Sequence, residues 1–174
     1  MTKSKLLIFA AIAILFMAIG AYVGVKRLYP APAENTAVAA LMQISLPDSK
    51  NQPRALAEWK GKTLLINFWA TWCPPCVAEM PELVELQAEM ASSNVQIIGI
   101  GIDSPSNIQQ FAEKLQISYP LLVAGMQGTE LSRQFGNQAG GLPFTVLIGP
   151  DGKLLQTYLG RLDMKKLRAD LGRH

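Results

Sequence analysis

The stretch that decides the fold lies at residues 65–81 and reads Leu65-Ile-Asn-Phe-Trp-Ala-Thr-Trp-Cys-Pro-Pro-Cys-Val-Ala-Glu-Met-Pro81. An apolar run at 63–69 is nearly continuous, as expected of a strand that is covered on both faces. Two cysteines three residues apart, Cys73 and Cys76, follow this run. We therefore predict a buried strand that leads into a Cys-Pro-Pro-Cys motif at the start of a helix.

The residues after the motif extend this pattern to a β-α-β unit. Residues 77–90 carry apolar side chains at helical spacing, and residues 95–102 form a second nearly continuous apolar run. The acidic side chains of the helix form one stripe, which we expect to be a solvated face. They are Glu82, Glu85 and Glu89.

The rest of the chain predicts further alternation of strands and helices. Ser104 as N-cap and Pro105 at the first helical position open another helix. Asp163 is expected to cap the last helix. The other elements expected are a hairpin around 41–46 and 54–56, a strand at 121–123, a helix at 129–136, and strands at 144–148 and 154–160 around a Pro-Asp-Gly-Lys turn. This order predicts an α/β fold, a mixed sheet with helices on both faces.

Composition and charge exclude several classes of protein. The chain has 174 residues, with 49% hydrophobic and 17% charged residues, which fits one folded domain and rules out overall disorder. Two cysteines and one histidine, His174, cannot supply the four ligands of a structural zinc site. Four of the 16 basic residues lie in residues 1–27, which hold no acid, and the remainder has 12 basic against 13 acidic residues. The folded part therefore has no basic excess for nucleic acid.

The N-terminus predicts a membrane anchor. Residues 6–25 are 20 consecutive uncharged residues, which as a helix would span about 30 Å. We predict a signal-anchor segment at 1–27, a linker at 28–40 and one folded domain at 41–174. A cleaved signal peptide is the alternative, and either case sends the domain across the membrane. A domain facing the cytoplasm also stays open, because the positive charges on the two sides of the segment are balanced.

The spacing of the two thiols favours redox chemistry. The positive end of the helix dipole lowers the pKa of the first thiol, which makes Cys73 the nucleophile. Cys76, one turn into the helix, is more enclosed and is expected to be the resolving thiol. Pro74 and Pro75 remove backbone N–H donors near the Cys73 sulfur, which favours a reducing pair. A static disulfide is the alternative, but a loop so short would restrict the unfolded chain little.

Residues 65–81 resemble the active-site signature of membrane-anchored thioredoxin-like proteins of the TlpA/ResA type. The resemblance covers about residues 40–172. Pro81 stands where these proteins kink the helix, and Gly141-Leu142-Pro143-Phe144-Thr145 matches their cis-proline loop. The resemblance implies a thioredoxin fold with an extra N-terminal hairpin and an inserted βα segment at about 95–115. It implies thiol–disulfide exchange with protein substrates outside the cytoplasm and without a cofactor.

The resemblance also implies partners. Reductases of this type receive electrons from a membrane thiol transporter and pass them to partners such as apocytochrome c or proteins that assemble copper sites. The expected location is the inner (cytoplasmic) membrane, crossed once, with the catalytic domain on the periplasmic side.

Further residues are expected to serve the dithiol. A cis bond before Pro143 would place the backbone of Leu142 beside the disulfide for strand-like pairing with substrate, and an ordinary trans proline is the alternative. Asn67 stands where thioredoxin carries a buried acid, and an amide cannot accept a proton. Glu79, three residues after Cys76, matches the glutamate of the TlpA/ResA branch and is expected to take the proton of Cys76. A solvated helix carboxylate is the alternative for Glu79.

Two tryptophans flank the motif. An exposed Trp72 would offer an apolar surface for an unfolded partner, whereas Trp69 is expected in the core. Asp103 ends the strand at 95–102, where sites often form, but it fits a helix-capping residue equally well.

The sequence therefore predicts a membrane-tethered protein-disulfide reductase that acts through Cys73 and Cys76. A disulfide oxidase or isomerase would use the same two residues. A copper-binding chaperone is a further alternative, because two thiolates can hold Cu(I). A peroxidase is less expected, because the only thiols belong to one motif.

Overall fold

The computed structural model describes residues 12, 15–17, 20 and 33–173. The predicted anchor at 6–25 thus lies mostly outside the described residues, and among those described no helix is long and apolar enough to cross a membrane. The anchor stays a prediction. The chain divides after Ala33, and the fold below is that of the second part.

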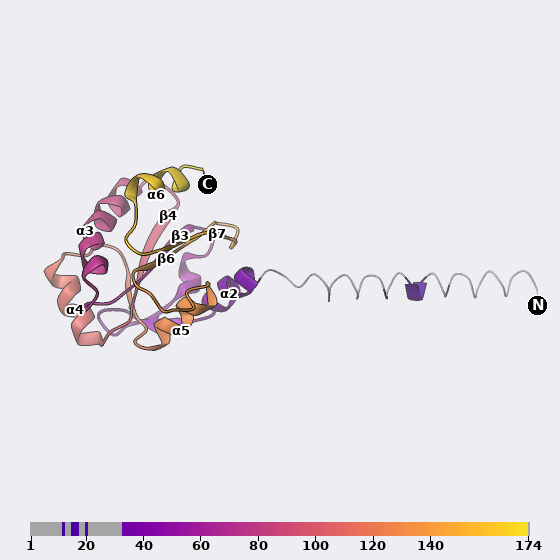
Figure 1. The fold of residues 1–174 in the computed structure, drawn as a ribbon, viewed down its shortest axis with the longest axis horizontal. Helices are drawn as coiled ribbons and strands as arrows, with labels where there is room; N and C mark the ends of the chain where they lie inside the picture. Colours follow the sequence, from indigo (N-terminus) through magenta and orange to yellow (C-terminus); the bar gives the residue numbers. More distant parts are fainter. Residues whose placement is uncertain (1–11, 13–14, 18–19, 21–32, 174) are drawn as a thin grey trace, which may run out of the picture. The chain divides into compact units, whose positions relative to one another are not determined.

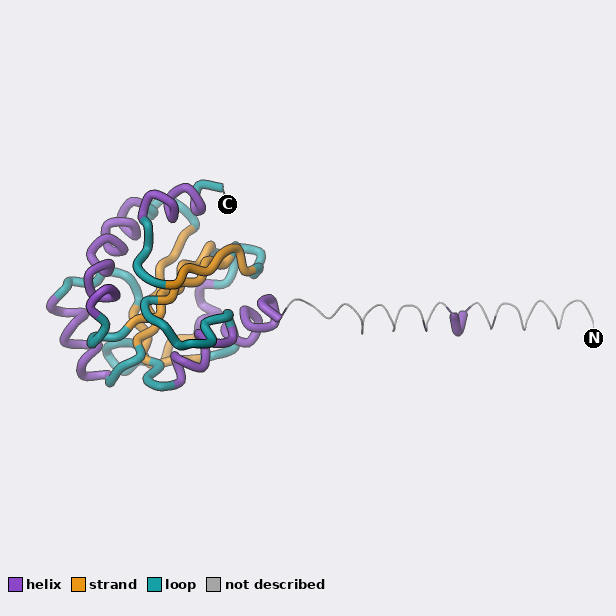
Figure 2. The backbone as a smooth tube through the Cα atoms, in the orientation of Figure 1, coloured by secondary structure: helices purple, strands orange, loops and turns teal. Residues whose placement is uncertain are grey.

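Five strands form one mixed sheet in the order β5-β4-β3-β6-β7 (Figures 1 and 2). Strand β3 pairs in parallel with β4 and antiparallel with β6. The strands are β3 (Thr63–Trp69), β4 (Val95–Gly101), β5 (Leu121–Val123), β6 (Phe144–Ile148) and β7 (Leu154–Leu159). The predicted mixed sheet and its element order are confirmed.

Strand β3 is the central strand of the sheet, and both of its faces are covered. All seven of its residues are buried. Leu65 and Trp69 belong to one hydrophobic cluster, and Ile66 and Phe68 belong to the other. The alternation of side chains along a strand therefore explains why the sequence here is almost wholly apolar.

Helices cover both faces of the sheet. The cluster that holds Leu65 and Trp69 receives side chains from three helices, α3 (Pro74–Glu89), α4 (Pro105–Lys114) and α6 (Met164–Leu171). The opposite cluster receives side chains from α2 (Ala33–Leu41), the 3-10 helix η1 (Leu56–Trp59) and the region of α5 (Gln127–Gln134). In Figure 2 the strands lie in the middle of the domain with helices around them.

The predicted helix caps are present. Ser104 Oγ accepts a hydrogen bond from Asn107 N at 3.3 Å. Asp163 Oδ1 accepts from the backbone N–H groups of Lys165 and Lys166 at 3.0 and 3.1 Å. These short polar side chains satisfy backbone donors that the first turn of a helix leaves unpaired, which is why the helices begin there.

The structure corrects two boundaries. The segment predicted as linker at 28–40 contains most of α2, and Ala37, Val38 and Leu41 are buried in the core. Their spacing places them on one face of a helix, so even a short segment has apolar surface to bury. The helix predicted at 129–136 begins and ends two residues earlier, at Gln127–Gln134, and Gly136 follows it with φ of 96°.

The predicted N-terminal hairpin is present in a short form. Strand β1 (Ser45–Pro47) pairs antiparallel with β2 (Pro53–Ala55). Residues 41–44, expected to open the hairpin, instead end α2 and turn into β1. The described domain therefore has the extra hairpin that the sequence indicated.

Candidate active site

The two cysteines lie where β3 gives way to α3. Cys73 is the N-cap of α3, with Pro74 at the first helical position, and the two sulfurs form a disulfide with Cα atoms 5.3 Å apart. The Cys73 side chain is 5% exposed and the Cys76 side chain is 0% exposed. The predicted difference in enclosure is confirmed: both residues are buried, and Cys73 is the more exposed of the two.

Glu79 is fully buried on α3, three residues after Cys76. Its Oε1 accepts a hydrogen bond from Asn67 Nδ2 at 2.8 Å, and its Oε2 accepts from the backbone N–H of Leu162 at 3.0 Å. Burial raises the pKa of Glu79, although these two donors and the charge of Arg161 act against the increase. The alternative of a solvated carboxylate is therefore wrong, and a raised pKa suits a group that exchanges protons near neutral pH.

Asn67 joins this carboxylate to the neighbouring strand. It is fully buried on β3, as predicted, and its Nδ2 also donates to Thr145 Oγ1 on β6 at 3.0 Å. Asn67 cannot itself accept a proton from a thiol at this position. The sequence indicated that it was buried but not that it bonds to Glu79.

The proline loop meets the dithiol at the same end of the sheet. The bond between Leu142 and Pro143 is cis, as predicted, and Phe144 at the start of β6 pairs in register with Phe68 near the end of β3. Since Trp69 follows Phe68, the loop and the Cys-Pro-Pro-Cys motif share one edge. Cys73 and Pro143, which are far apart in the sequence, thus belong to one site.

A residue that the sequence analysis missed holds the proline loop. Asn137 Nδ2 donates to Gly141 O at 2.9 Å, and Gly141 N donates to Asn137 Oδ1 at 3.0 Å. Asn137 is buried, with 4% of its surface exposed. The sequence did hold a signal for this role. Asn137 follows Gly136 and precedes Gly141 by four residues, and asparagine side chains near turns often bond to the backbone.

A groove with a volume of about 520 Å³ lies beside the motif. Trp72, which is 65% exposed, and Met126, which is 82% exposed, are among its lining residues. The other lining residues are Ile102, Asp103, Ser104, Pro105, Val123, Ala124 and Gly125. Trp72 is thus exposed and Trp69 is buried, as predicted.

Asp103 joins the motif to the start of α4. It accepts hydrogen bonds from Thr71 Oγ1, from the backbone N–H of Ser104 and from Asn107 Nδ2. Burial raises the pKa of Asp103, but these donors together lower it below its ordinary value. The carboxylate is therefore occupied within the protein, which favours the structural interpretation over a catalytic one.

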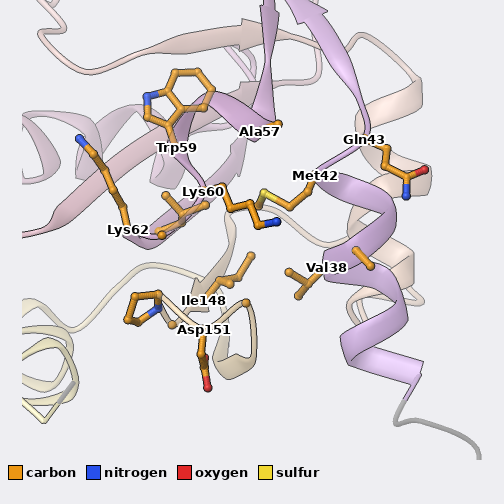
Figure 3. Close-up of a pocket in the computed structure, with 15 residues that line it drawn as sticks. Val38, Met42, Gln43, Ala57, Trp59, Lys60, Lys62, Ile148 and Asp151 are labelled. Carbon is orange, nitrogen blue, oxygen red and sulfur yellow. The ribbon is translucent and has the colours of Figure 1, made fainter.

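A second groove, of about 480 Å³, lies at the opposite end of β3 and β6 (Figure 3). Figure 3 shows Val38 of α2 and Gln43 of the turn after it on one side, and the turn after Ile148 with Asp151 on the other. None of its lining residues is a cysteine or a buried acid. The dithiol end of the sheet is therefore the candidate active site.

Metal-binding side chains do not gather in this domain. Within the described part of the chain, no three of the His, Cys, Asp and Glu side chains come together as a metal site would require. Cys73 and Cys76 are the only cysteines in the sequence.

Comparisons with known proteins agree with this geometry. The model of the Redoxin family matches residues 32–171. The chain is 30% identical over 142 residues to the thiol-disulfide oxidoreductase ResA of Geobacillus thermodenitrificans, covering 79% of each protein. It is 31% identical over 145 residues to ResA of Geobacillus kaustophilus, covering 81% of this chain and 79% of the relative.

Solved structures show the same likeness. A thiol:disulfide interchange protein of the thioredoxin family from Chlorobium tepidum superimposes with a TM-score of 0.65 at 28% identity, covering 75% of this chain and 91% of that one. A secreted Mycobacterium tuberculosis disulfide oxidoreductase superimposes with a TM-score of 0.66 at 20% identity, covering 78% and 98%. The second likeness concerns the fold alone.

Proposed function

The chain belongs to the Redoxin family and is a thioredoxin-like thiol-disulfide oxidoreductase of the TlpA/ResA type, and on this premise we propose that it reduces the disulfides of protein substrates outside the cytoplasm. The observation that carries the proposal is the arrangement of the dithiol. Cys73 lies at the helix start and is the more exposed of the two cysteines, while Cys76 is fully buried on the same helix face as Glu79.

The reaction proceeds in two exchange steps. In the reduced enzyme the Cys73 thiolate attacks one sulfur of a substrate disulfide, forms a mixed disulfide, and releases the other substrate sulfur as a thiolate that takes up a proton. Cys76 then loses its proton to Glu79 and attacks Cys73 Sγ. The Cys73–Cys76 disulfide forms and the second substrate thiol leaves, so that two electrons pass from the enzyme to the substrate.

The proline loop and the groove at Trp72 support a protein substrate. Leu142 is part-buried two residues before the start of β6, so an extended substrate segment can pair with its backbone in the manner of an added strand. The exposed indole of Trp72 adds apolar surface for an unfolded chain. Leu142, Pro143 and Trp72 are therefore the substrate-binding residues of this proposal.

The start of α3 supports the reducing direction. Pro74 and Pro75 have no N–H, and the donor found at the Cys73 sulfur is the backbone N–H of Cys76, at 3.3 Å. A thiolate with few donors is less stabilised, which makes the dithiol form a stronger reductant.

The uncharged segment at 6–25 supports a place in the inner membrane, with the catalytic domain in the periplasm. A reductase in this compartment needs electrons from across the membrane, and a membrane thiol transporter is the donor proposed here. The proposed substrates are proteins that must be reduced before they bind haem or copper, such as apocytochrome c.

The reduction potential tests the direction. The full chain in detergent is equilibrated with glutathione or dithiothreitol mixtures, and free thiols are counted by labelling. A value at or below about −270 mV, the potential of thioredoxin, supports the reductase, whereas a value near about −120 mV, that of DsbA, makes the protein a disulfide donor. Stoichiometric copper retained by the reduced protein would instead support a copper chaperone.

A further inference from the structure

Three buried side-chain atoms in the described part of the chain have no hydrogen-bond partner within the protein. They are Asn67 Oδ1, Trp69 Nε1 and the hydroxyl of Tyr119. The Asn67 and Trp69 side chains are 0% exposed and the Tyr119 side chain is 3% exposed. Buried polar atoms in folded proteins are almost always bonded, either to protein or to an ordered water. Three such atoms in one domain need an explanation.

The three residues meet at Gly99. Asn67 and Gly99 are partners in the register of β3 and β4. A Cβ atom at Gly99 would lie 3.2 Å from Trp69 Nε1 and 3.4 Å from Tyr119 Cε2. Asn67 turns its amide nitrogen toward Glu79 and Thr145, so its amide oxygen points away from both of them. The side chains that carry the unpartnered atoms therefore lie together beside Gly99 of β4.

The same region adjoins the carboxylate of Glu79. Asn67 bonds to Glu79 directly, at 2.8 Å. Burial raises the pKa of Tyr119, and the nearby charge of Glu79 raises it further. Tyr119 is therefore protonated at every working pH, and its hydroxyl is available as a hydrogen-bond donor.

We propose that a buried water molecule binds between Tyr119, Trp69 and Asn67, and that through this water Tyr119 is a positioning residue for Glu79. The donors and acceptors match the ligand. Trp69 Nε1 can only donate and Asn67 Oδ1 can only accept, while the Tyr119 hydroxyl can donate. A water can accept hydrogen bonds from Trp69 Nε1 and the Tyr119 hydroxyl and donate one to Asn67 Oδ1. These are the three hydrogen bonds that a buried water typically makes.

The water has a definite effect on the carboxylate. When Asn67 Oδ1 is held by the water, Asn67 Nδ2 stays directed at Glu79 Oε1 and stabilises the ionised form. Without the Tyr119 hydroxyl, the water binds less well and Asn67 Oδ1 is less firmly fixed. The hydrogen bond from Asn67 Nδ2 to Glu79 then weakens, so the pKa of Glu79 rises further. The other groups that face this carboxylate are Arg161, whose charge lowers its pKa, and Glu82, whose charge raises it. The test leaves both of them unchanged.

This inference rests on the proposed role of Glu79 as proton acceptor for Cys76, and the test separates the two. The reduced full chain in detergent reacts with an aromatic disulfide that releases coloured nitrothiobenzoate. Attack by Cys73 releases the first nitrothiobenzoate, and attack of Cys76 on Cys73 Sγ releases the second. The rate of the second release as a function of pH reports the proton transfer from Cys76. The variants are Y119F, E79Q and their double mutant.

The control is Y158F, which also removes a tyrosine hydroxyl. The Tyr158 hydroxyl donates to Asp170 Oδ2 at 2.6 Å, so its loss costs a hydrogen bond away from the dithiol. We expect Y119F to raise the pH midpoint by about half a unit and to lower the Tm, since a bonded hydroxyl is lost. We expect Y158F to leave the midpoint unchanged. In the E79Q background, Y119F should no longer shift the profile.

Two results would overturn the inference. If E79Q alters the profile but Y119F leaves the midpoint unchanged and raises the Tm, then the hydroxyl has no partner, because removal of an unpaired buried polar group stabilises a protein. In that case the proposed function stands without the water. If E79Q itself leaves the profile unchanged, Glu79 does not take the proton, and the role of Tyr119 fails with it.

Discussion

The backbone N–H of Leu162 donates a hydrogen bond of 3.0 Å to Glu79 Oε2, which joins residues 83 positions apart in the sequence. The segment between β7 and α6 thus reaches the helix that carries the dithiol. Arg161 strengthens this connection, because its guanidinium pairs with Glu82 at 2.7 Å. Since Asn67 Nδ2 donates to Oε1, both carboxylate oxygens of Glu79 accept hydrogen bonds from groups that the fold positions.

The raised pKa of Glu79 predicts a pH dependence of stability. The unfolded carboxyl titrates near its ordinary value of 4.5, whereas the folded one keeps its proton to higher pH. The native state thus binds more protons between the two values, and stability falls as pH rises from about 4.5 through the folded pKa, by about 1.4 kcal/mol per unit of difference. Glutamine does not titrate, so E79Q should lose this part of the slope.

Urea unfolding of the wild type and E79Q from pH 4 to pH 8 measures this effect. The quantity to follow is the difference between the two free energies of unfolding, because it cancels the titration of all other groups. We expect this difference to move in favour of E79Q as pH rises. A constant difference would mean that the folded pKa of Glu79 is not raised.

Replacement of Cys73 and replacement of Cys76 should have different effects on the trapping of substrate. Because Cys73 is at the helix start and more exposed than Cys76, Cys76→Ala should accumulate a mixed disulfide between Cys73 and its substrates. Cys73→Ala should form none and lose reductase activity. Mass spectrometry of complexes separated without reductant provides the measurement. Substrate trapped on Cys76 in the Cys73→Ala variant would contradict the assignment of the nucleophile.

Trp72→Ala should affect the binding of protein substrates more than the chemistry. The indole is 65% exposed, so its removal should change the free energy of unfolding by no more than about 0.5 kcal/mol. We expect KM for a protein disulfide to rise by about tenfold, equivalent to about 1.4 kcal/mol of binding, with kcat nearly unchanged. The rate with a small aromatic disulfide serves as the control and should stay the same. An equal loss with both substrates would place Trp72 in the chemical step.

Gly99→Ala should destabilise the domain by about 1–3 kcal/mol, because the new methyl group would collide with the side chain of Leu121. A Cβ at this position would lie 2.5 Å from Leu121 Cδ2. Gly172→Ala is the matched control, since its nearest contact would be an ordinary 3.4 Å to Arg168 O. Chemical denaturation of both variants measures the difference. Equal stability of the two would show that β5 moves aside without cost.

The parts of the site that the sequence predicted depend on local signals. A Cys-Pro-Pro-Cys motif between an apolar strand and a helix, a proline at a strand start, and Ser104 and Asp163 as caps are all visible within a few residues. Glu79 was predicted from its spacing and from its match to the glutamate of the TlpA/ResA branch. Its burial was not predicted, because that depends on Leu162 and Asn67, which lie elsewhere in the chain.

Contacts between distant segments explain the remaining differences. The acidic stripe on α3 is solvated, as expected, but its ion pairs were not predicted: Glu89 pairs with Arg168 of α6 at 2.8 Å, and Glu82 pairs with Arg161. Which arginine meets which glutamate follows from how α6 packs beside α3, and helical spacing holds no information about that packing. The same holds for α2, whose burial depends on the sheet face that it covers.

The position of the proline loop has a consequence for dissection of the chain. Both thiols lie on the β3–α3 segment, while Leu142, Pro143 and Leu162 come from the last third of the sequence. A chain divided between α5 and Asn137 would carry its nucleophile in one fragment and its substrate-pairing loop, with a donor to Glu79, in the other. Thiol exchange with protein substrates would then report the reassociation of two separately expressed polypeptides, as in a fragment-complementation assay.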